Sequence, residues 1–441
     1  MKPKIITPPP GPKAKRLIAR DKRIISPSLP RVYPFAPHHG HGANLWDEDG
    51  NRYIDFNSGV AVMSVGYRNP RILRAVRQQL PKLTHNVHMA YYPELPVTFS
   101  EQLVKLLPKG LDHVFLGNSG ADAVEAAMKL ARYNTRRRYF VAFTGCFHGR
   151  TYGAVSMTIS KPVYREGFEP FLDAVHAPYP YVYRHPSGDA EECVTDCIDK
   201  LEKLLKKIGP KNASAIFTEP IQGEGGYIVP PKSFFRELRR ICDRHGILLV
   251  DDEVQAGCMR TGKFLAIEHF GVKPDIVCLA KALGGGLPLG AMIARKALMR
   301  WPRGSHASTF AGNALSCAAG LEALDILGDP RLGRKVTKDG EHVRKRMREV
   351  QDDREILGDV RGLGLMVGLE FVKDRKTKAY ATKERDAIVQ GAFRRGVLVL
   401  PAGHSALRIA PPLIIGREDL DAGLDVLSDV INDVSRRGGR R

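Results

Sequence analysis

Short runs of apolar residues alternate with amphipathic stretches through the middle of the chain. Four or five consecutive nonpolar residues are typical of strands buried on both faces, and apolar side chains repeated every three or four residues are typical of helices packed by one side. This alternation predicts an α/β domain with a mostly parallel sheet, helices on both faces and right-handed crossover connections. The strands are expected at residues 114–116, 139–143, 215–217, 247–250, 276–279 and 291–294.

The rest of the chain carries a different pattern. Alternating apolar side chains on either side of a turn at Gly50 predict a β-hairpin over residues 45–56. After residue 310, helical periodicity and a few short strands predict a smaller α+β domain. Helices are expected at residues 70–83, 95–107, 234–245, 314–327, 331–350, 383–395 and 417–434, and further strands at 365–372, 397–400 and 407–409.

These patterns divide the chain into five parts. The first is proline-rich and basic, so we expect it to be extended, with ordered structure beginning near Leu17. The parts are a basic tail at 1–16, a segment contributing to the small domain at 17–68, the large domain at 69–328, the C-terminal small domain at 329–435, and a basic tail at 436–441.

Composition narrows the class of protein. Of the 441 residues, 43% are hydrophobic and 26% are charged, which is typical of a globular protein with a large core. No apolar run approaches the roughly 20 residues that cross a bilayer. The N-terminus also lacks the apolar core of a secretory signal. We therefore expect a cytoplasmic protein without a membrane partner.

The net charge of +20 raises the alternative of a basic nucleic-acid-binding protein. However, nine Lys or Arg residues stand against Asp21 alone in residues 1–31, and four more arginines follow residue 435. The two ends thus hold twelve of the twenty excess charges. The body of the chain is only mildly basic and contains no recognisable nucleic-acid module, so this alternative is distant.

The seven cysteines are an odd number scattered along the chain. Only Cys193 and Cys197 are close, four residues apart, which places them on one face of an expected helix. No second cluster completes a metal site, so we expect free thiols and no metal.

Two apolar runs in the predicted sheet end in polar residues. The run 247–250 is followed by Asp251 and Asp252, and the run 276–280 is followed by Lys281 and three glycines. In an open α/β sheet the carboxyl ends of strands meet at one edge. A lysine among apolar residues can act as an amine nucleophile, and a lysine with a carboxylate partner is how pyridoxal phosphate is held. On these residues alone, a lysine with its head in water is an equal alternative.

The stretch 118–121 lies between an expected strand and a helix N-terminus. Free N–H groups and the helix dipole favour a phosphate there, and Ser119 adds a hydroxyl. Taken alone, an ordinary helix cap by Asn118 or Ser119 explains the stretch better. Phe147 follows another strand and could lie against a flat ring, although an isolated phenylalanine is more often part of a core.

Residues 219–226, EPIQGEGG, follow a further strand. Two carboxylates among several glycines indicate a functional loop, and a solvated turn is the alternative.

Six blocks of sequence carry a family resemblance. They resemble the signature blocks of the class III, ornithine or 4-aminobutyrate type, aminotransferases, which are fold-type I pyridoxal-phosphate enzymes. The resemblance covers residues 44–413. In chain order the blocks are NSGADAVEAAMKLAR, FHGRT, EPIQGEGG, DDEVQAGCMRTGKF, AKALGGGLPLGA and STFAGNALSC.

The resemblance implies a role for each residue that matches a block. Lys281 would form the Schiff base and, once released by substrate, move the proton between substrate and cofactor. Asp252 would pair with the pyridine nitrogen and keep it protonated. Gln255 would approach the ring hydroxyl, Phe147 would stack on the ring, and His148 would lie beside it.

Further residues are implied to bind phosphate and substrate. Ser119, Gly120 and Ala121 would hold the phosphate from one subunit and Thr309 from the other, so a complete site implies a homodimer or a higher oligomer. Arg408, in ALRIAPPL, would clamp a substrate carboxylate, and Glu224 would pair with this arginine and release it. Without the resemblance, Arg408 would be interpreted as a surface ion pair.

Some positions depart from the family pattern. The family often has glycine-histidine where this chain has Gly66 and Tyr67, and its usual QTGFGRTG reads QAGCMRTG here. Ornithine-specific enzymes carry a tyrosine near the position of Val60, so a more apolar pocket is expected.

The sequence therefore predicts an aminotransferase that uses pyridoxal 5′-phosphate, with an amino acid as donor and 2-oxoglutarate as the expected acceptor. An amino-acid racemase on the same scaffold is the alternative. A second acid or base on the opposite ring face would favour the racemase, and the sequence does not identify one.

Overall fold

The computed structural model describes residues 2–438, which form two compact units. The larger unit is Pro70–Val336, and the smaller unit combines Met1–Asn69 with Thr337–Arg441. Residues 439–441 of the expected C-terminal tail lie outside the described part of the chain.

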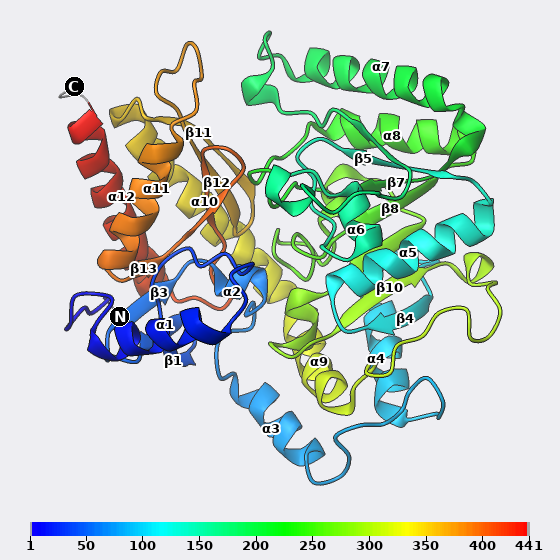
Figure 1. Ribbon diagram of the computed structural model, residues 1–441, viewed down its shortest axis with the longest axis horizontal. Helices are drawn as coiled ribbons and strands as arrows, with labels where there is room; N and C mark the ends of the chain where they lie inside the picture. Colours follow the sequence, from blue (N-terminus) through cyan, green and yellow to red (C-terminus); the bar gives the residue numbers. More distant parts are fainter. Residues whose placement is uncertain (1, 439–441) are drawn as a thin grey trace. The chain divides into compact units, whose positions relative to one another are not determined.

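The larger unit is built on a seven-stranded sheet with the order β4-β10-β9-β8-β7-β5-β6 (Figure 1). Neighbouring strands are parallel except at β10, which runs antiparallel to both β4 and β9. The prediction of a mostly parallel sheet is thus confirmed. The strands are β4 (His113–Gly117), β5 (Tyr139–Phe143), β6 (Ala174–Ala177), β7 (Ala213–Thr218), β8 (Leu248–Asp252), β9 (Ile276–Leu279) and β10 (Gly290–Ala294).

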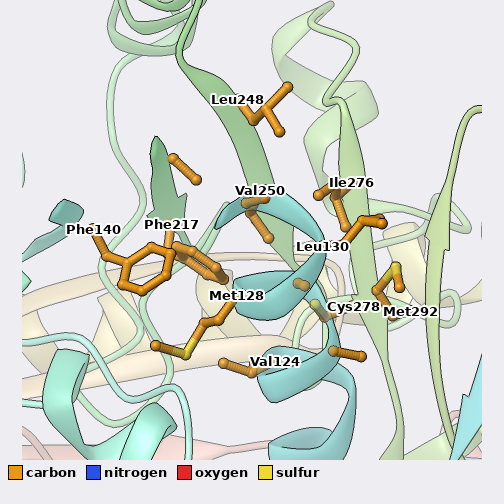
Figure 2. Packing of buried hydrophobic residues seen from close by; sticks show 14 of the residues in the cluster. Val124, Met128, Leu130, Phe140, Phe217, Leu248, Val250, Ile276, Cys278 and Met292 are labelled. Carbon is orange, nitrogen blue, oxygen red and sulfur yellow. The ribbon is translucent and has the colours of Figure 1, made fainter. Parts of the chain in front are cut away.

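Helix α5 (Gly120–Thr135) packs against one face of this sheet through its apolar side (Figure 2). Val124, Met128 and Leu130 meet alternate residues of the strands, among them Val250 and Cys278. Because strand side chains alternate between faces, Asp252 shares this face with Val250, whereas Asp251 points to the other. The other helices of this unit are α3 (Pro70–Gln79), α4 (Glu94–Lys105), α6 (Tyr152–Met157), α7 (Ala190–Ile208), α8 (Lys232–His245) and α9 (Ala314–Leu327).

The smaller unit contains two four-stranded sheets, β1-β2-β3-β13 and β11-β12-β15-β14. The expected hairpin is present as the antiparallel pair β2 and β3, and β3 also pairs with β13 in parallel. The strands are β1 (Pro37–His41), β2 (Asn44–Asp47), β3 (Arg52–Asp55), β11 (Leu357–Leu363), β12 (Met366–Phe371), β13 (Val397–Leu398), β14 (Leu400–Ala402) and β15 (Ala406–Ile409).

Most helices outside the large unit follow the expected pattern. Helix α2 is unusual, because all of its residues have positive φ. The helices are α1 (Pro12–Ile24), α2 (Ser58–Ala61), α10 (Pro330–Asp353), α11 (Thr382–Arg394) and α12 (Arg417–Gly438). Short 3₁₀ turns occur at Pro162–Tyr164, Val182–Arg184, Pro210–Asn212, Ala266–Phe270, Lys281–Gly284 and Lys296–Leu298.

The expectation that ordered structure begins near Leu17 is wrong. Lys4 already bridges to Arg52, and α1 begins at Pro12. The N–H groups of Lys13 and Ala14 donate to the two carboxylate oxygens of Asp49, each at 2.9 Å. This cap comes from a residue far along the chain, so the local sequence gives no sign of it.

The cysteines, the apolar helices and the clusters of possible metal ligands bear on the remaining sequence predictions. All seven cysteines are free and buried. Within the described residues, no helix has the length and apolarity needed to span a membrane, and no group of three or more His, Cys, Asp or Glu side chains is arranged to hold a metal.

The Asp49 cap generates a stability prediction. Asp49→Ala removes the acceptor for the first N–H groups of α1 and should cost about 1 kcal/mol of helix stability. Hydrogen–deuterium exchange of the peptide covering α1 should therefore accelerate. Glu48→Ala is the matched control, and equal exchange in the two variants would contradict the assignment of Asp49 as the cap.

Candidate active site

The candidate residues of the larger unit gather at the edge of the sheet where β5, β7, β8 and β9 end. Each of these strands is followed by a polar segment, and β4 also ends at this edge because Gly117 pairs with the first residue of β10, Gly290. Asp252 is the last residue of β8 and pairs with Cys278 of β9, three residues before Lys281. The fold thus brings the acid and the amine to neighbouring strand ends, as the sequence predicts.

Lys281 is held in a strained backbone conformation. Its φ of 49° is left-handed, which costs a residue with a Cβ roughly 1–2 kcal/mol. The residue opens the 3₁₀ turn Lys281–Gly284, and the turn ends at Gly285, where φ is 60°. The side chain is half-buried. Strain of this kind persists only where the surrounding structure fixes it, which is common at functional sites.

Asp252 is paired with His148. The Nδ1 atom of His148 lies 2.7 Å from Oδ2 of Asp252, and the N–H of Val254 donates to Oδ1 at 3.1 Å. Both side chains are buried. Burial opposes a charge on the imidazole, yet Cys146 and Asp252 beside it raise the pKa of His148 well above its ordinary value. The raised pKa favours a protonated His148, which can donate from Nδ1 to Asp252.

Ser119 caps helix α5. Its hydroxyl accepts from the N–H of Asp122 at 3.1 Å, as the local alternative expected. The N–H groups of Gly120 and Ala121 belong to the first turn, where no partner exists within a helix. A Cβ on Gly120 would lie 2.7 Å from Val254. The cap and a phosphate cradle are therefore compatible, since the cap uses the hydroxyl and leaves the first N–H groups at the helix end.

Phe147 does not belong to the core. Its ring is half-buried and lies edge-on to Tyr164, with centroids 5.5 Å apart, and the Arg150 guanidinium is 5.8 Å from its centroid. Its N–H donates to Oε1 of Glu219 at 3.0 Å. A ring that keeps one side accessible can lie against a flat ligand.

Gln255 is oriented by a tyrosine that sequence reasoning missed. The hydroxyl of Tyr227 donates to Oε1 of Gln255 at 2.9 Å. A Cβ on Gly223 would lie 2.2 Å from Nε2 of Gln255, so the amide fills the space that a side chain there would need. Glu224, on the same loop as Gly223, is buried.

Asp251 points to the opposite face of the sheet from Asp252 and interacts with the buried Glu253. Both oxygens of Asp251 are buried. Burial, followed by Glu253, raises the pKa of Asp251 well above its ordinary value, and burial raises the pKa of Glu253 to about 8. The two carboxyls thus retain a proton near neutral pH.

Thr309 is exposed within its own chain. Its neighbour Ser308 lies 2.9 Å from Nδ2 of Asn118, and Phe310 exposes 63% of its surface. Both Ser308 and Thr309 line a pocket of about 630 Å³ beside α5. Asp122, Glu125 and Lys129 also line this pocket, so its wall within one chain carries both signs of charge.

Arg408 lies in the smaller unit, on β15, where it pairs with Gly368 and Leu400. Its side chain is 7% exposed, so the alternative of a surface ion pair is wrong. In the same unit the Tyr67 hydroxyl donates to the buried Asp55 at 2.7 Å. The tyrosine that stands where the family often has histidine thus has a structural role.

The residues of the larger unit suit pyridoxal 5′-phosphate. Lys281 supplies an amine, Asp252 supplies an anion next to a cationic histidine, and the N-terminus of α5 supplies N–H donors. Glycine at positions 120 and 223 lets Val254 and Gln255 pack directly against the backbone of the two loops. An aldehyde, a ring nitrogen and a phosphate are the groups that such a donor set recognises.

Comparison with known proteins points to the same chemistry. The family Aminotransferase class-III matches residues 27–431. A leucine/methionine racemase of Thermococcus litoralis is 38% identical over 95% of this chain and 96% of its own. An acetylornithine aminotransferase of Methanopyrus kandleri is 40% identical over 89% of this chain and 93% of its own.

A solved structure extends the comparison to the fold. The crystal structure of an amine transaminase from an uncultivated Pseudomonas species, in the PLP-bound (internal aldimine) form, matches with a TM-score of 0.85 and 30% identity. The match covers 91% of this chain and 95% of that one. With its cofactor pyridoxal 5′-phosphate, this chain belongs to the class III aminotransferase family of fold-type I enzymes, whose members include both aminotransferases and racemases.

Proposed function

We propose that the protein is an aminotransferase that moves an amino group from an amino acid to an oxo acid, with 2-oxoglutarate as the acceptor. The observation that carries this proposal is the pairing of β8 with β9, which sets the Asp252–His148 couple beside the strand end that leads to Lys281. When bound, pyridoxal phosphate supplies an electron sink for a carbanion at the amino-bearing carbon.

Each residue of the site has a proposed part in holding that group. Lys281 holds it through Nζ, Asp252 fixes the charge on the ring nitrogen, and Phe147 covers one ring face. Gln255, held by Tyr227, faces the ring hydroxyl. Ser119, Gly120 and Ala121 hold the phosphate at the end of α5.

Lys281 also moves the proton that distinguishes the possible reactions. In transfer, the Lys281 amine would take the proton from the substrate's amino-bearing carbon and carry it to the cofactor side, while the bound cofactor would supply the electron sink. Arg408 binds the substrate carboxylate. Thr309 completes the phosphate site of the partner subunit, so the active form is a homodimer.

A racemase is the second candidate function. The relatives divide between the two reactions, at 38% identity to a leucine/methionine racemase and 40% to an acetylornithine aminotransferase. The position of Val60 favours an amino acid with an apolar side chain, because ornithine-specific enzymes carry a tyrosine there. A racemase returns the proton to the same carbon from the opposite face, which needs no oxo acid.

Dependence on an oxo acid separates the two functions. The holoenzyme is incubated with a panel of L- and D-amino acids, with and without 2-oxoglutarate, and the products are resolved by chiral chromatography. Transfer predicts glutamate and a new oxo acid only when 2-oxoglutarate is present. Equal formation of the opposite enantiomer in its absence would establish racemisation instead.

Substitution of the amine tests the central assignment. Lys281→Ala removes the proton carrier and should lower turnover at least about 10²–10⁴-fold. The visible absorbance of the holoenzyme should also change, because the covalent attachment is lost. Lys296→Ala, which changes an exposed lysine on the next 3₁₀ turn along the chain, is the control. Retained turnover in Lys281→Ala would exclude the assignment.

Mixed dimers test whether Thr309 acts across the subunit boundary. A dimer of one Lys281→Ala chain and one Thr309→Ala chain has only one intact Lys281, which belongs to the Thr309→Ala chain. If Thr309 serves the partner's site, that lysine meets an intact threonine and the mixed dimer should regain about half the wild-type activity per dimer. Activity no higher than that of the Thr309→Ala homodimer would show that Thr309 serves its own chain, and a fully active monomer in sedimentation would contradict the dimer.

A further inference from the structure

Glu219 joins two loops that both carry site residues. It is the first residue after β7 and is buried. Oε1 accepts from the N–H of Phe147 at 3.0 Å, and Oε2 accepts from the N–H of Gly223 at 2.8 Å. One carboxylate therefore binds the loop 144–150 to the loop 219–226.

The two loops are also packed closely against each other. Nε2 of Gln222 donates to the carbonyl of Thr144 at 2.8 Å. A Cβ on Gly225 would lie 2.8 Å from the carbonyl oxygen of Gly145. The hydrogen bond from Gln222 and the close backbone contact at Gly225 thus hold the two loops against each other.

The charges around Glu219 are few and specific. His148 of the loop 144–150 and Asp252 at the end of β8 act on it, and the Tyr179 hydroxyl donates to the carbonyl oxygen of Glu219 at 2.9 Å. Burial raises the pKa of Glu219 to about 7, while His148 and the two N–H donors favour the carboxylate. A group with this balance changes its protonation near neutral pH.

We propose that Glu219 is a positioning residue whose carboxylate latches the loop of Phe147 to the loop of Glu224, and that uptake of a proton by Glu219 opens the latch. The proposal rests on the proposed function, because Phe147 matters there as the residue that stacks on the cofactor ring. A carboxylate accepts both N–H groups through separate oxygens. A carboxylic acid places a hydrogen on one oxygen, which then competes with the N–H donor.

The latch has a defined dependence on pH. Above about pH 7 the carboxylate form holds both loops, and below it the bond to one loop weakens. The stability of the fold changes in the opposite sense. Because the folded pKa is raised, the contribution of Glu219 to stability is greatest at low pH and is lost as pH rises from 4.5 through about 7. A latch that works above pH 7 thus costs some stability there.

Amide exchange in the holoenzyme tests the latch directly. Glu219→Gln keeps one acceptor oxygen and replaces the other with a donor, so exchange at either Phe147 or Gly223 should rise about five- to tenfold at pH 8. The unfolding temperature of this variant should also fall less than that of the wild type between pH 5 and pH 8. Glu202→Gln, which removes an exposed ion pair with Arg244, is the control and should change neither amide.

The outcomes separate the latch from the enzyme activity. Unchanged exchange at both amides in Glu219→Gln would overturn the latch, whatever reaction the enzyme catalyses. If that variant does not fold, the wild type provides the test. As the pH falls below about 7, the amides of Phe147 and Gly223 should exchange faster than the intrinsic pH dependence of amide exchange predicts, and exchange that follows the intrinsic dependence would overturn the latch. Faster exchange in a protein with neither transfer nor racemase activity would keep the latch and reject the proposed function.

Discussion

The buried ion pair between His148 and Asp252 is the interaction on which the site depends. Two charges removed from water cost several kcal/mol each unless they are paired and hydrogen-bonded. Here Nδ1 of His148 lies 2.7 Å from Oδ2 of Asp252, and the N–H of Val254 donates to Oδ1. The backbone N–H of His148 donates to the Thr158 hydroxyl at 2.9 Å, which fixes the main chain at the histidine. The direction of the Asp252 carboxyl group is thus set before any ligand arrives, which is what preorganisation requires.

Close backbone approach is the second constraint at this edge of the sheet. A Cβ on Gly290 would lie 2.2 Å from the carbonyl oxygen of Ser119, so the start of β10 and the end of β4 are in contact at the cap of α5. Lys281 is held at positive φ in the turn that leads to Gly284–Gly286. Glycine at position 290 permits the close contact, and Lys281 bears backbone strain where the strand ends converge.

Much of the fold could be predicted because it depends on local pattern. The runs at β5 and β9 and the periodicity of α9 give the observed bounds, since a buried strand or a packed helix leaves its period in the sequence. The start of α1 could not be predicted, because its cap is Asp49. Strand β6 could not be predicted either, because it is short and only its last residue is fully buried, so it leaves no clear apolar run in the sequence. The candidate site residues came from motifs. The bonds of Glu219 and Tyr227 were missed because each joins segments far apart in sequence.

The left-handed turn at Ser58–Ala61 has a consequence for how substitutions there would be interpreted. Val60 has φ of 65°, a region that β-branched residues almost never occupy, and Gly59 beside it has φ of 60°. Glycine or asparagine at position 60 would relieve the backbone. A substitution of Val60 therefore changes the backbone energy and the side chain together. Its effect on stability would measure the sum of a loss of side-chain contacts and a gain from relieved strain.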